Sequence, residues 1–461
     1  MSAPIIWIGL PGLMSIVLWL IRRNERRTLI LGLGFSLFLI ITSLITNVDK
    51  AFIQIGSTSI QVNSSITILG RTFSFGNGDL IIVSLLFMIL FLYTSMAFVI
   101  DVPVKFVPTA FLIVSLFLAA LSVQPFLYAA LLLEICVILA VVLFTDFGSQ
   151  PSQGVLRFII FQTLALPFIL TSGWVLSAIE ANPTETKLII QALILLGLGF
   201  SFWVGVFPFN SWMPQIANDN PPFEVGFILL MFNTVVLVLI IRYLDGFVWL
   251  RDDATIFFVL RILGILMTIT GSLFFLMEKN IYRTTAYIIS FETGLSILAL
   301  SLNKESGWDA FVLMFLPRIL AVAMWSMLLS FIQQNDRLMS DEEKVFHPAV
   351  IAGFTITALS LAGLPLLPAF PSRVLLYSEL ARIDIFVLIW VFISNIMFIA
   401  AIIKFLKAIA VKVRNWPITT FPIAEKIYHI LFLSIVIVIG LIPQIFLRSM
   451  LAILEAFPNL K

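Results

Sequence analysis

The chain has 461 residues, of which 61% are hydrophobic and only 11% are charged, and its mean hydropathy is +1.12. Soluble domains do not have this composition, which is typical of a protein that crosses a membrane many times as helices. The formal net charge of +2 gives no support for nucleic-acid binding; one cysteine excludes an internal disulfide, and with only two histidines we expect no metal site.

Apolar runs of about 20 residues predict fourteen membrane spans, and therefore an all-α, polytopic membrane protein. The first run starts close to the amino terminus without a cleavage signal, so we expect it to be the first span of the mature chain. In chain order the predicted spans are about 4–21, 28–46, 79–100, 106–123, 126–146, 155–178, 187–206 (continuing to about 219), 223–243, 254–277, 284–302, 308–332, 347–366 (continuing to about 381), 384–408 and 427–447.

Residues 50–78, between the second and third predicted spans, alternate polar and apolar side chains (FIQIGSTSIQVNSSITIL, then RTFSFGNGD). Such alternation is typical of β-strands, so we expect a β-hairpin that lies outside the bilayer. The other predicted loops are too short for a folded domain. We therefore expect no redox or nucleotide-binding domain, no active site and no cofactor on this chain.

Two predicted spans are interrupted by proline in the same way. The first break reads GVFPFNSWMPQIANDNPP, from Gly205 to Pro222, and the second reads LAGLPLLPAFPSR, from Leu361 to Arg373. Proline frees a backbone carbonyl, which is tolerated at membrane depth only where protein or water satisfies it. Paired broken helices therefore indicate an ion or substrate path, although bent helices without transport would leave the same pattern. The prolines concerned are Pro208, Pro221, Pro222, Pro365, Pro368 and Pro371.

A glutamate inside an apolar run precedes each break. Glu134 lies 74 residues before Pro208, and Glu292 lies 73 residues before Pro365. A charged side chain at mid-bilayer costs roughly 2.5–3.5 kcal/mol, so both glutamates should face other helices or water. We interpret them as proton-path residues. The alternative is a structural carboxyl, which for Glu292 could be satisfied by Thr285, Ser290 and Thr293.

Three arginines, Arg261, Arg318 and Arg373, also fall inside predicted spans. Arginine stays charged in proteins, so none of them can pass a proton by titrating. Each can hold a carboxylate ionised or fix water. Arg318 follows Pro317, where a loosened helix could hydrate it, and Arg373 follows Pro371 and Ser372 at the second break. Snorkelling towards the membrane surface or structural pairing is the alternative.

Loop charges give an orientation. With fourteen spans, fifteen Lys and Arg residues fall on the side of the odd-to-even connections and nine on the side of the termini. The positive-inside rule then places both termini on the non-cytoplasmic side.

The chain resembles the antiporter-like, proton-conducting subunits of respiratory complex I and of multi-subunit sodium/proton antiporters. The matching pieces are LLLEICVIL around Glu134, FPFNSWMPQ with NPP at the first break, NIYRTTAYIISFETG from Asn280 to Gly294, FLPRILAVAM around Arg318, and LAGLPLLPAFPSR at the second break. The resemblance implies two inverted five-helix repeats, formed by spans 4–8 and 9–13, with spans 7 and 12 broken. The implied domains are 1–104 (spans 1–3 with the hairpin), 105–250 (first repeat), 251–410 (second repeat) and 411–461 (span 14 and tail).

The sequence departs from this family at its lysines. Where the family usually has a span-7 lysine, five residues before the proline, this chain has Trp203, which could plug the first half-channel. The usual basic residue of span 8 corresponds to about Thr234, and the motif histidine after Pro-Phe is Asn210. Arg318 and Arg373 replace the usual lysines or acids of spans 11 and 12. The lysine relay implied by the resemblance is therefore absent.

The resemblance implies a membrane-arm subunit of a complex I-like, redox-driven proton translocase that works with a donor such as NADH or ferredoxin and with a quinone. Its partners would be the other membrane subunits, lipids and protons, in a bacterial plasma membrane, a thylakoid or an organelle inner membrane. Glu134 and Glu292 either load and release protons, or the chain is a structural and coupling subunit that has lost conduction. A subunit of a sodium/proton antiporter is the third possibility.

Overall fold

The computed structural model describes residues 2–49, 51–55, 58–146, 148–181, 185–338, 348–413 and 423–460. Of the loop cations counted for the orientation, Lys50, Lys344, Arg414 and Lys461 lie outside the described residues. The chain divides into two compact units. Unit 1 comprises Met1–Val204, Met231–Asp252 and Ala452–Lys461, and unit 2 comprises Gly205–Leu230 and Asp253–Leu451.

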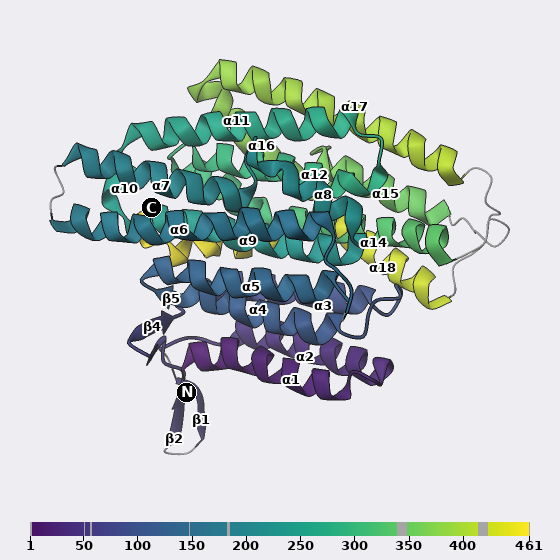
Figure 1. Ribbon diagram of the computed structural model, residues 1–461, viewed down its shortest axis with the longest axis horizontal. Coiled ribbons are helices and arrows are strands. Elements are labelled where there is room, and N and C mark those ends of the chain that lie inside the picture. Colours follow the sequence, from purple (N-terminus) through teal and green to yellow (C-terminus); the bar gives the residue numbers. More distant parts are fainter. Residues whose placement is uncertain are drawn as a thin grey trace. The chain divides into compact units, whose positions relative to one another are not determined.

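Unit 1 is a group of helices with a small β-structure after the second of them (Figure 1). Within it α1 packs on α4, α2 on α3, α4 on α5, and α6 on α7. Its elements are α1 (Leu10–Ile21), α2 (Glu25–Ile45), β1 (Ala51–Ile55), β2 (Thr58–Gln61), β3 (Ser65–Ile68), β4 (Arg71–Ser74), α3 (Asp79–Met96), α4 (Phe106–Ser122), β5 (Val123–Gln124), α5 (Ala129–Phe144), α6 (Gln153–Ala181), α7 (Thr186–Val204), the second part of α9 (Pro222–Gly246) and α10 (Val248–Asp252), with a π-helical turn at Ile5–Gly9 and short 3₁₀ turns at Phe126–Tyr128, Ala452–Ala456 and Pro458–Leu460.

Unit 2 begins with the first break and carries the second. In it α11 packs on both α12 and α17, α14 on α15, and α13 on α16. Its elements are α8 (Trp212–Asp219), the first part of α9, α11 (Ala254–Met277), α12 (Thr284–Leu300), α13 (Glu305–Leu313), α14 (Phe315–Leu338), α15 (Pro348–Leu361), α16 (Phe370–Ile383), α17 (Ile385–Val413), α18 (Ile423–Leu441) and α19 (Gln444–Leu451), with short 3₁₀ turns at Phe209–Ser211 and Ile281–Arg283.

Within the described residues, nine helices are long and apolar enough to cross a membrane, and a tenth if the pair Ile427–Leu441 and Gln444–Ala456, bent by 76°, is one span. Three shorter apolar helices, Ile5–Ile21, Phe106–Ser122 and Pro348–Leu361, lie where spans 1, 4 and 12 are predicted. A helical, multi-pass membrane protein is therefore confirmed, and the count of fourteen spans stays a prediction.

The alternating segment between α2 and α3 forms two short antiparallel hairpins where the pattern predicts one. β1 pairs with β2, and β3 pairs with β4, which is extended by the two-residue strand β5. Leu69 and Gly70 have positive φ and form the turn between β3 and β4, because a strand cannot continue through a left-handed residue pair. Residues 62–64 separate the two hairpins.

Both breaks begin with a glycine in the left-handed conformation. Gly205 (φ +69°) directly follows α7, and Gly363 (φ +73°) follows α15. A residue with positive φ is the usual way to end a helix, and glycine adopts it without a steric penalty. The two glycines lie 158 positions apart in the sequence, the same offset as that between Glu134 and Glu292.

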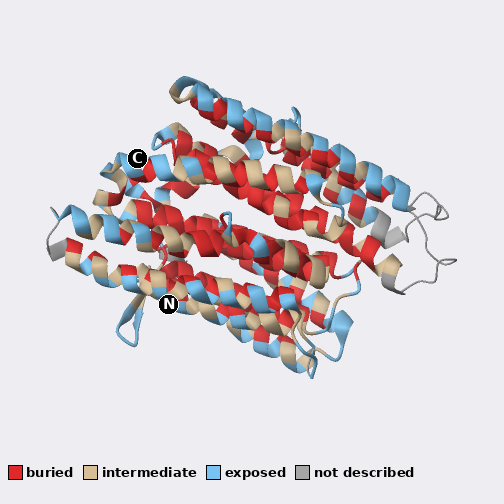
Figure 2. Cartoon of the chain, turned by 45° about the horizontal axis from the view of Figure 1, so that its top comes forward, coloured by how far each residue is buried: buried red, intermediate tan, exposed pale blue. Residues whose placement is uncertain are grey.

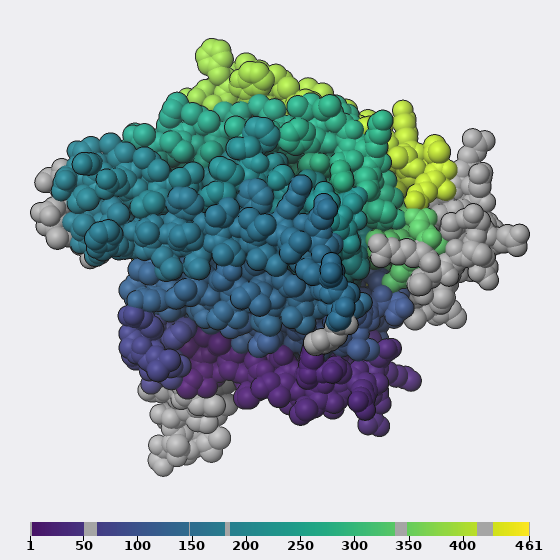
Figure 3. Space-filling model, viewed as in Figure 1, coloured from purple at the N-terminus to yellow at the C-terminus, as the bar shows by residue number. Residues whose placement is uncertain are grey.

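Burial differs strongly between helices. Every residue of the apolar window of α9 is buried, and the same holds for the span Glu305–Asp336, whereas only 28% is buried in α2 and 33% in α6. The helices with exposed faces alternate buried and exposed residues along their length (Figure 2). The side chains of α1 and α2, purple in Figure 3, lie on the surface of unit 1. Leu13, Ile16 and Leu20 of α1 are exposed. Such apolar faces suit lipid or neighbouring membrane subunits.

Candidate functional site

The centre of unit 2 holds a buried ion pair. The guanidinium of Arg373, through Nη2, binds Oε1 of Glu292 on α12. Arg373 and Glu292 are 2% and 3% exposed, so the pair is removed from solvent. The same Nη2 donates at 3.3 Å to the carbonyl oxygen of Leu361, the last residue of α15. One side chain therefore ties α12 to the second break.

Arg318 on α14 is the third member of this cluster. It is 1% exposed, its Nη1 donates to Oγ of Ser296 at 3.1 Å, and its guanidinium lies 5.1 Å from the ring centre of Phe315. It is near enough to Glu292 and Arg373 to interact electrostatically with both. We call Glu292, Arg318 and Arg373 the charge cluster. Its formal charge is +1, from two guanidinium groups and one carboxylate.

The hydroxyls proposed as local partners of Glu292 do not bind its carboxylate. Thr293 donates instead to the carbonyl oxygen of Ile289 at 2.7 Å. The hydroxyls of Thr285 and Ser290 have no hydrogen-bond partner among the described residues. The local partners suggested for Glu292 are therefore wrong, and its partner is Arg373. Such a partner, 81 positions away, leaves no signature in the sequence.

Close packing of α11 on α12 positions Glu292. A Cβ at Gly271 would come within 2.8 Å of the backbone nitrogen of Phe291, and one at Gly294 within 2.8 Å of the backbone nitrogen of Thr268. Small residues at such crossings let two helix backbones approach closely in a membrane. The backbone on both sides of Glu292 is therefore held against α11.

The described part of unit 1 has no equivalent cluster around Glu134. Glu134 on α5 is half-buried, and Oγ1 of Thr163 on α6 donates to its Oε1 at 2.6 Å. Among the described residues no ion pair of Glu134 is found. On the neighbouring position of α6, the fully buried amide of Gln162 finds no hydrogen-bond partner in the described part of the chain.

Trp203, at the end of α7, is 4% exposed and belongs to an aromatic group. Its ring centre lies 5.6 Å from that of Phe200, which lies 5.5 Å from that of Tyr243 on α9. Phe126 and Phe247 extend the group around Tyr243 at 6.3 and 5.9 Å. Trp203 therefore places an indole ring beside Phe200 at the position where the resemblance implies a lysine.

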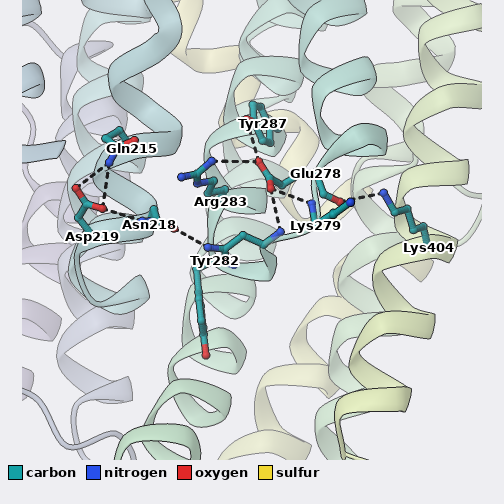
Figure 4. Close-up of polar contacts among 10 residues, drawn as sticks. Gln215, Asn218, Asp219, Glu278, Lys279, Tyr282, Arg283, Tyr287 and Lys404 are labelled. Atoms are coloured by element: carbon teal, nitrogen blue, oxygen red, sulfur yellow. Dashed lines mark hydrogen bonds and ion pairs between the residues drawn. The ribbon is translucent and has the colours of Figure 1, made fainter. Parts of the chain in front are cut away.

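The first break carries a polar network that reaches the start of α12 (Figure 4). Pro208 follows α7, Pro221 lies between α8 and α9, and Pro222 is the first residue of α9. Between them, Asp219 accepts hydrogen bonds from Gln215 and Asn218 at 2.8–3.2 Å. Asn280 donates through Nδ2 to Oδ1 of Asn218 at 2.5 Å.

Glu278 is the centre of the other half of this network. Its carboxylate accepts from the backbone N–H groups of Lys279 and Asn280 at 2.8 and 2.9 Å and from the hydroxyl of Tyr287 at 3.3 Å. Lys404 on α17 donates to the carbonyl oxygens of Leu276 and Glu278 at 2.7 and 3.0 Å, at the carboxyl end of α11 (Figure 4). A cavity of about 210 Å³ opens beside these residues.

At the second break, Pro365 and Pro368 lie between α15 and α16, and Pro371 lies in the first turn of α16. A Cβ at Gly363 would come within 2.7 Å of Cγ of Arg373. The turn that ends α15 therefore leaves room for the arginine side chain only because it carries glycine.

Two further arginines, Arg242 and Arg261, form ion pairs that the sequence did not predict. Arg242 on α9 binds Asp79 at the start of α3, both in unit 1 and both largely buried. The sequence placed Arg242 in a loop, since nothing in it links positions 163 apart. Arg261 on α11 lies 3.5 Å from Asp384 and is half-buried, as the structural alternative for this arginine implies.

Residues 175–399 match the family described as NADH:quinone oxidoreductase/Mrp antiporter, TM. The chain is 28% identical over 201 residues to NADH-quinone oxidoreductase subunit N 1 of Thermodesulfovibrio yellowstonii, which covers 40% of this chain and 42% of that protein. It is 24% identical over 291 residues to subunit N from Heliobacterium modesticaldum, 61% of each chain. The chain spans about half the length of the curated relatives it matches.

Solved structures match the whole fold. A chain of the archaeal membrane-bound sulfane sulfur reductase gives a TM-score of 0.82 at 16% identity and covers 100% of both chains. A chain of respiratory complex I from Thermus thermophilus gives 0.75 at 18%, with 99% of both chains covered, and one of the Mrp complex from Dietzia gives 0.79 at 14%, with 100% and 98% covered. The fold is that of a complex I membrane subunit, and residues 175–399 of the chain match the NADH:quinone oxidoreductase/Mrp antiporter family of membrane subunits.

Proposed function

We propose that this chain is a membrane-arm subunit of a multi-subunit, redox-driven ion translocase of the complex I type. Its family, the names of its curated relatives and the shared fold support this proposal. In this proposal the chain crosses the membrane fourteen times in two inverted repeats and has both termini on the non-cytoplasmic side. Electron transfer and quinone chemistry take place in partner subunits, and the buried charges of this chain respond electrostatically to them.

The charge cluster of unit 2 is the observation that carries the proposed role. A buried ion pair is costly to break, at about 3–5 kcal/mol, because the remaining partner is left uncompensated. The Glu292–Arg373 pair joins α12 to the end of α15 at the second break. A charge displaced in a neighbouring subunit would therefore act on a fixed electrostatic element, and the chain would transmit that change along the membrane.

We further propose that the first half of the chain conducts no protons. Glu134 has a threonine as its hydrogen-bond partner, and Trp203 lies among aromatic rings. A proton relay needs groups that take up and release protons along its path, and the aromatic group around Trp203 offers only the hydroxyl of Tyr243, which has no hydrogen-bond partner among the described residues. The chain is then a coupling subunit, in which Glu292 responds to its partners and Glu134 does not carry protons.

The alternative is a subunit of a sodium/proton antiporter, which the match to a chain of the Mrp complex favours. Affinity purification of the tagged full chain from its native membrane, followed by reconstitution into vesicles, separates the two functions. We expect redox-active subunits in the purified complex and proton uptake that requires an electron donor. A complex without redox centres that exchanges sodium for protons under an imposed pH gradient would favour the antiporter and overturn our proposal.

A further inference from the structure

The charge cluster has more positive than negative charge. Arg318, Arg373 and Glu292 are each at least 97% buried, and the two arginines remain protonated in proteins. One carboxylate therefore faces two guanidinium groups. A buried charge without a counter-charge costs several kcal/mol, so this arrangement requires a further source of negative charge.

The position of Arg373 in its helix adds to this imbalance. Arg373 is the fourth residue of α16, which begins at Phe370. The first turn of a helix carries partial positive charge from its free N–H groups. A cation is disfavoured there and an anion is favoured, so the start of α16 strengthens the positive potential at the cluster.

Several donors of the cluster have no acceptor in the described part of the chain. They are Nε and Nη2 of Arg318 and Nη1 of Arg373. The remaining nitrogen contacts of the two arginines are to Ser296, Glu292 and the carbonyl oxygen of Leu361. The hydroxyl of Tyr377, close enough to interact electrostatically with Arg373 and Glu292, also lacks a partner among the described residues.

We propose that Arg318 and Arg373 bind a small monovalent anion, of which chloride is the abundant example. Water could satisfy the three N–H donors, but it would leave the excess charge uncompensated. A lipid phosphate or a peptide carboxylate cannot reach groups that are 1–2% exposed without opening the helix packing. A halide supplies one negative charge, accepts several N–H donors at once and needs no covalent connection to the surface.

The test uses the purified native complex in buffers of equal ionic strength that contain chloride, bromide or gluconate. We expect the thermal midpoint of this subunit to rise with the logarithm of halide concentration and not with gluconate, since a ligand of the folded state stabilises it by mass action. Density maps in bromide should show a peak within hydrogen-bond distance of both guanidinium groups, and maps in gluconate should not.

Arg318→Met removes the excess charge and keeps the apolar stem, so it should assemble and weaken the apparent halide affinity about tenfold or more. Arg318→Lys keeps the charge and loses N–H donors, so it should weaken the apparent halide affinity less than Arg318→Met does. Arg261→Met is the matched control, because this half-exposed arginine lies beside Asp384 and outside the cluster. Equal midpoints of the wild type in chloride and gluconate, or an unchanged halide response in Arg318→Met, would overturn the anion site.

Discussion

Arg373 contacts two different elements, because it binds the carboxylate of Glu292 and the last carbonyl oxygen of α15. Arg318, in contrast, has no direct bond to a carboxylate and donates to Ser296. The two arginines that replace the family's titratable residues are therefore not equivalent. Arg373 is part of an ion pair, and Arg318 sets the electrostatic potential around it.

This difference predicts an order of effects in substitutions. Glu292→Gln removes the cluster's carboxylate and leaves two buried cations, whereas Arg373→Met leaves Glu292 with Arg318, so that the charges balance. We expect Glu292→Gln to lower the unfolding free energy by about 3–5 kcal/mol and Arg373→Met by less. Thermal midpoints of the purified complex measure this, and an equal or larger loss in Arg373→Met would contradict it.

Glu134 should tolerate substitution much better. Its side chain is half-buried and accepts one hydrogen bond, from Thr163, which an amide oxygen can also accept. Glu134→Gln is therefore expected to change stability by about 1 kcal/mol or less, with assembly unchanged. Thr163→Val is the companion variant, since it removes the donor and keeps the carboxylate. Loss of assembly in Glu134→Gln would show that a partner outside this chain depends on the charge.

At the scale of elements, the contact of α11 with α12 determines where Glu292 lies. Gly271→Ala places a methyl group 2.8 Å from a backbone nitrogen, which cannot move aside as a side chain can. We expect a cost of about 1–3 kcal/mol from this overpacking and less assembled complex. Gly34→Ala in α2 is the matched control, because its Cβ meets nothing within 4 Å. Unchanged stability and assembly in Gly271→Ala would contradict the view that close contact of α11 with α12 is needed.

The sequence was a good guide to elements that membrane physics dictates. Long apolar runs predicted the helices, and proline predicted both breaks, since backbone groups in a bilayer have few alternatives. Charges at membrane depth identified Glu292, Arg318 and Arg373. The pairing of Glu292 with Arg373, and that of Arg242 with Asp79, could not be predicted, because each joins helices far apart in the chain. The position of a charged residue within an apolar run can be found from the sequence, but its ion-pair partner depends on tertiary contacts.

At the scale of the whole molecule, the two glutamates have different surroundings. The breaks and the glutamates recur, with glycines and glutamates at the same offset of 158 residues. The charge cluster around Glu292 lies in unit 2, while the described part of unit 1 has a half-buried Glu134, aromatic rings around Trp203 and a separate buried pair of Arg242 with Asp79. A chain with this cluster around only one of its two glutamates suits the transmission of an electrostatic change better than the passage of protons along two equivalent paths.

The number of protons translocated per electron, measured in vesicles that contain the native complex, tests this division most directly. We expect Glu134→Gln to keep the wild-type ratio, because the first half carries no protons. In Glu292→Gln complexes that assemble and still transfer electrons, the ratio should fall, because the charge cluster is altered. A ratio lowered by Glu134→Gln and unchanged by Glu292→Gln would contradict the role proposed for each half.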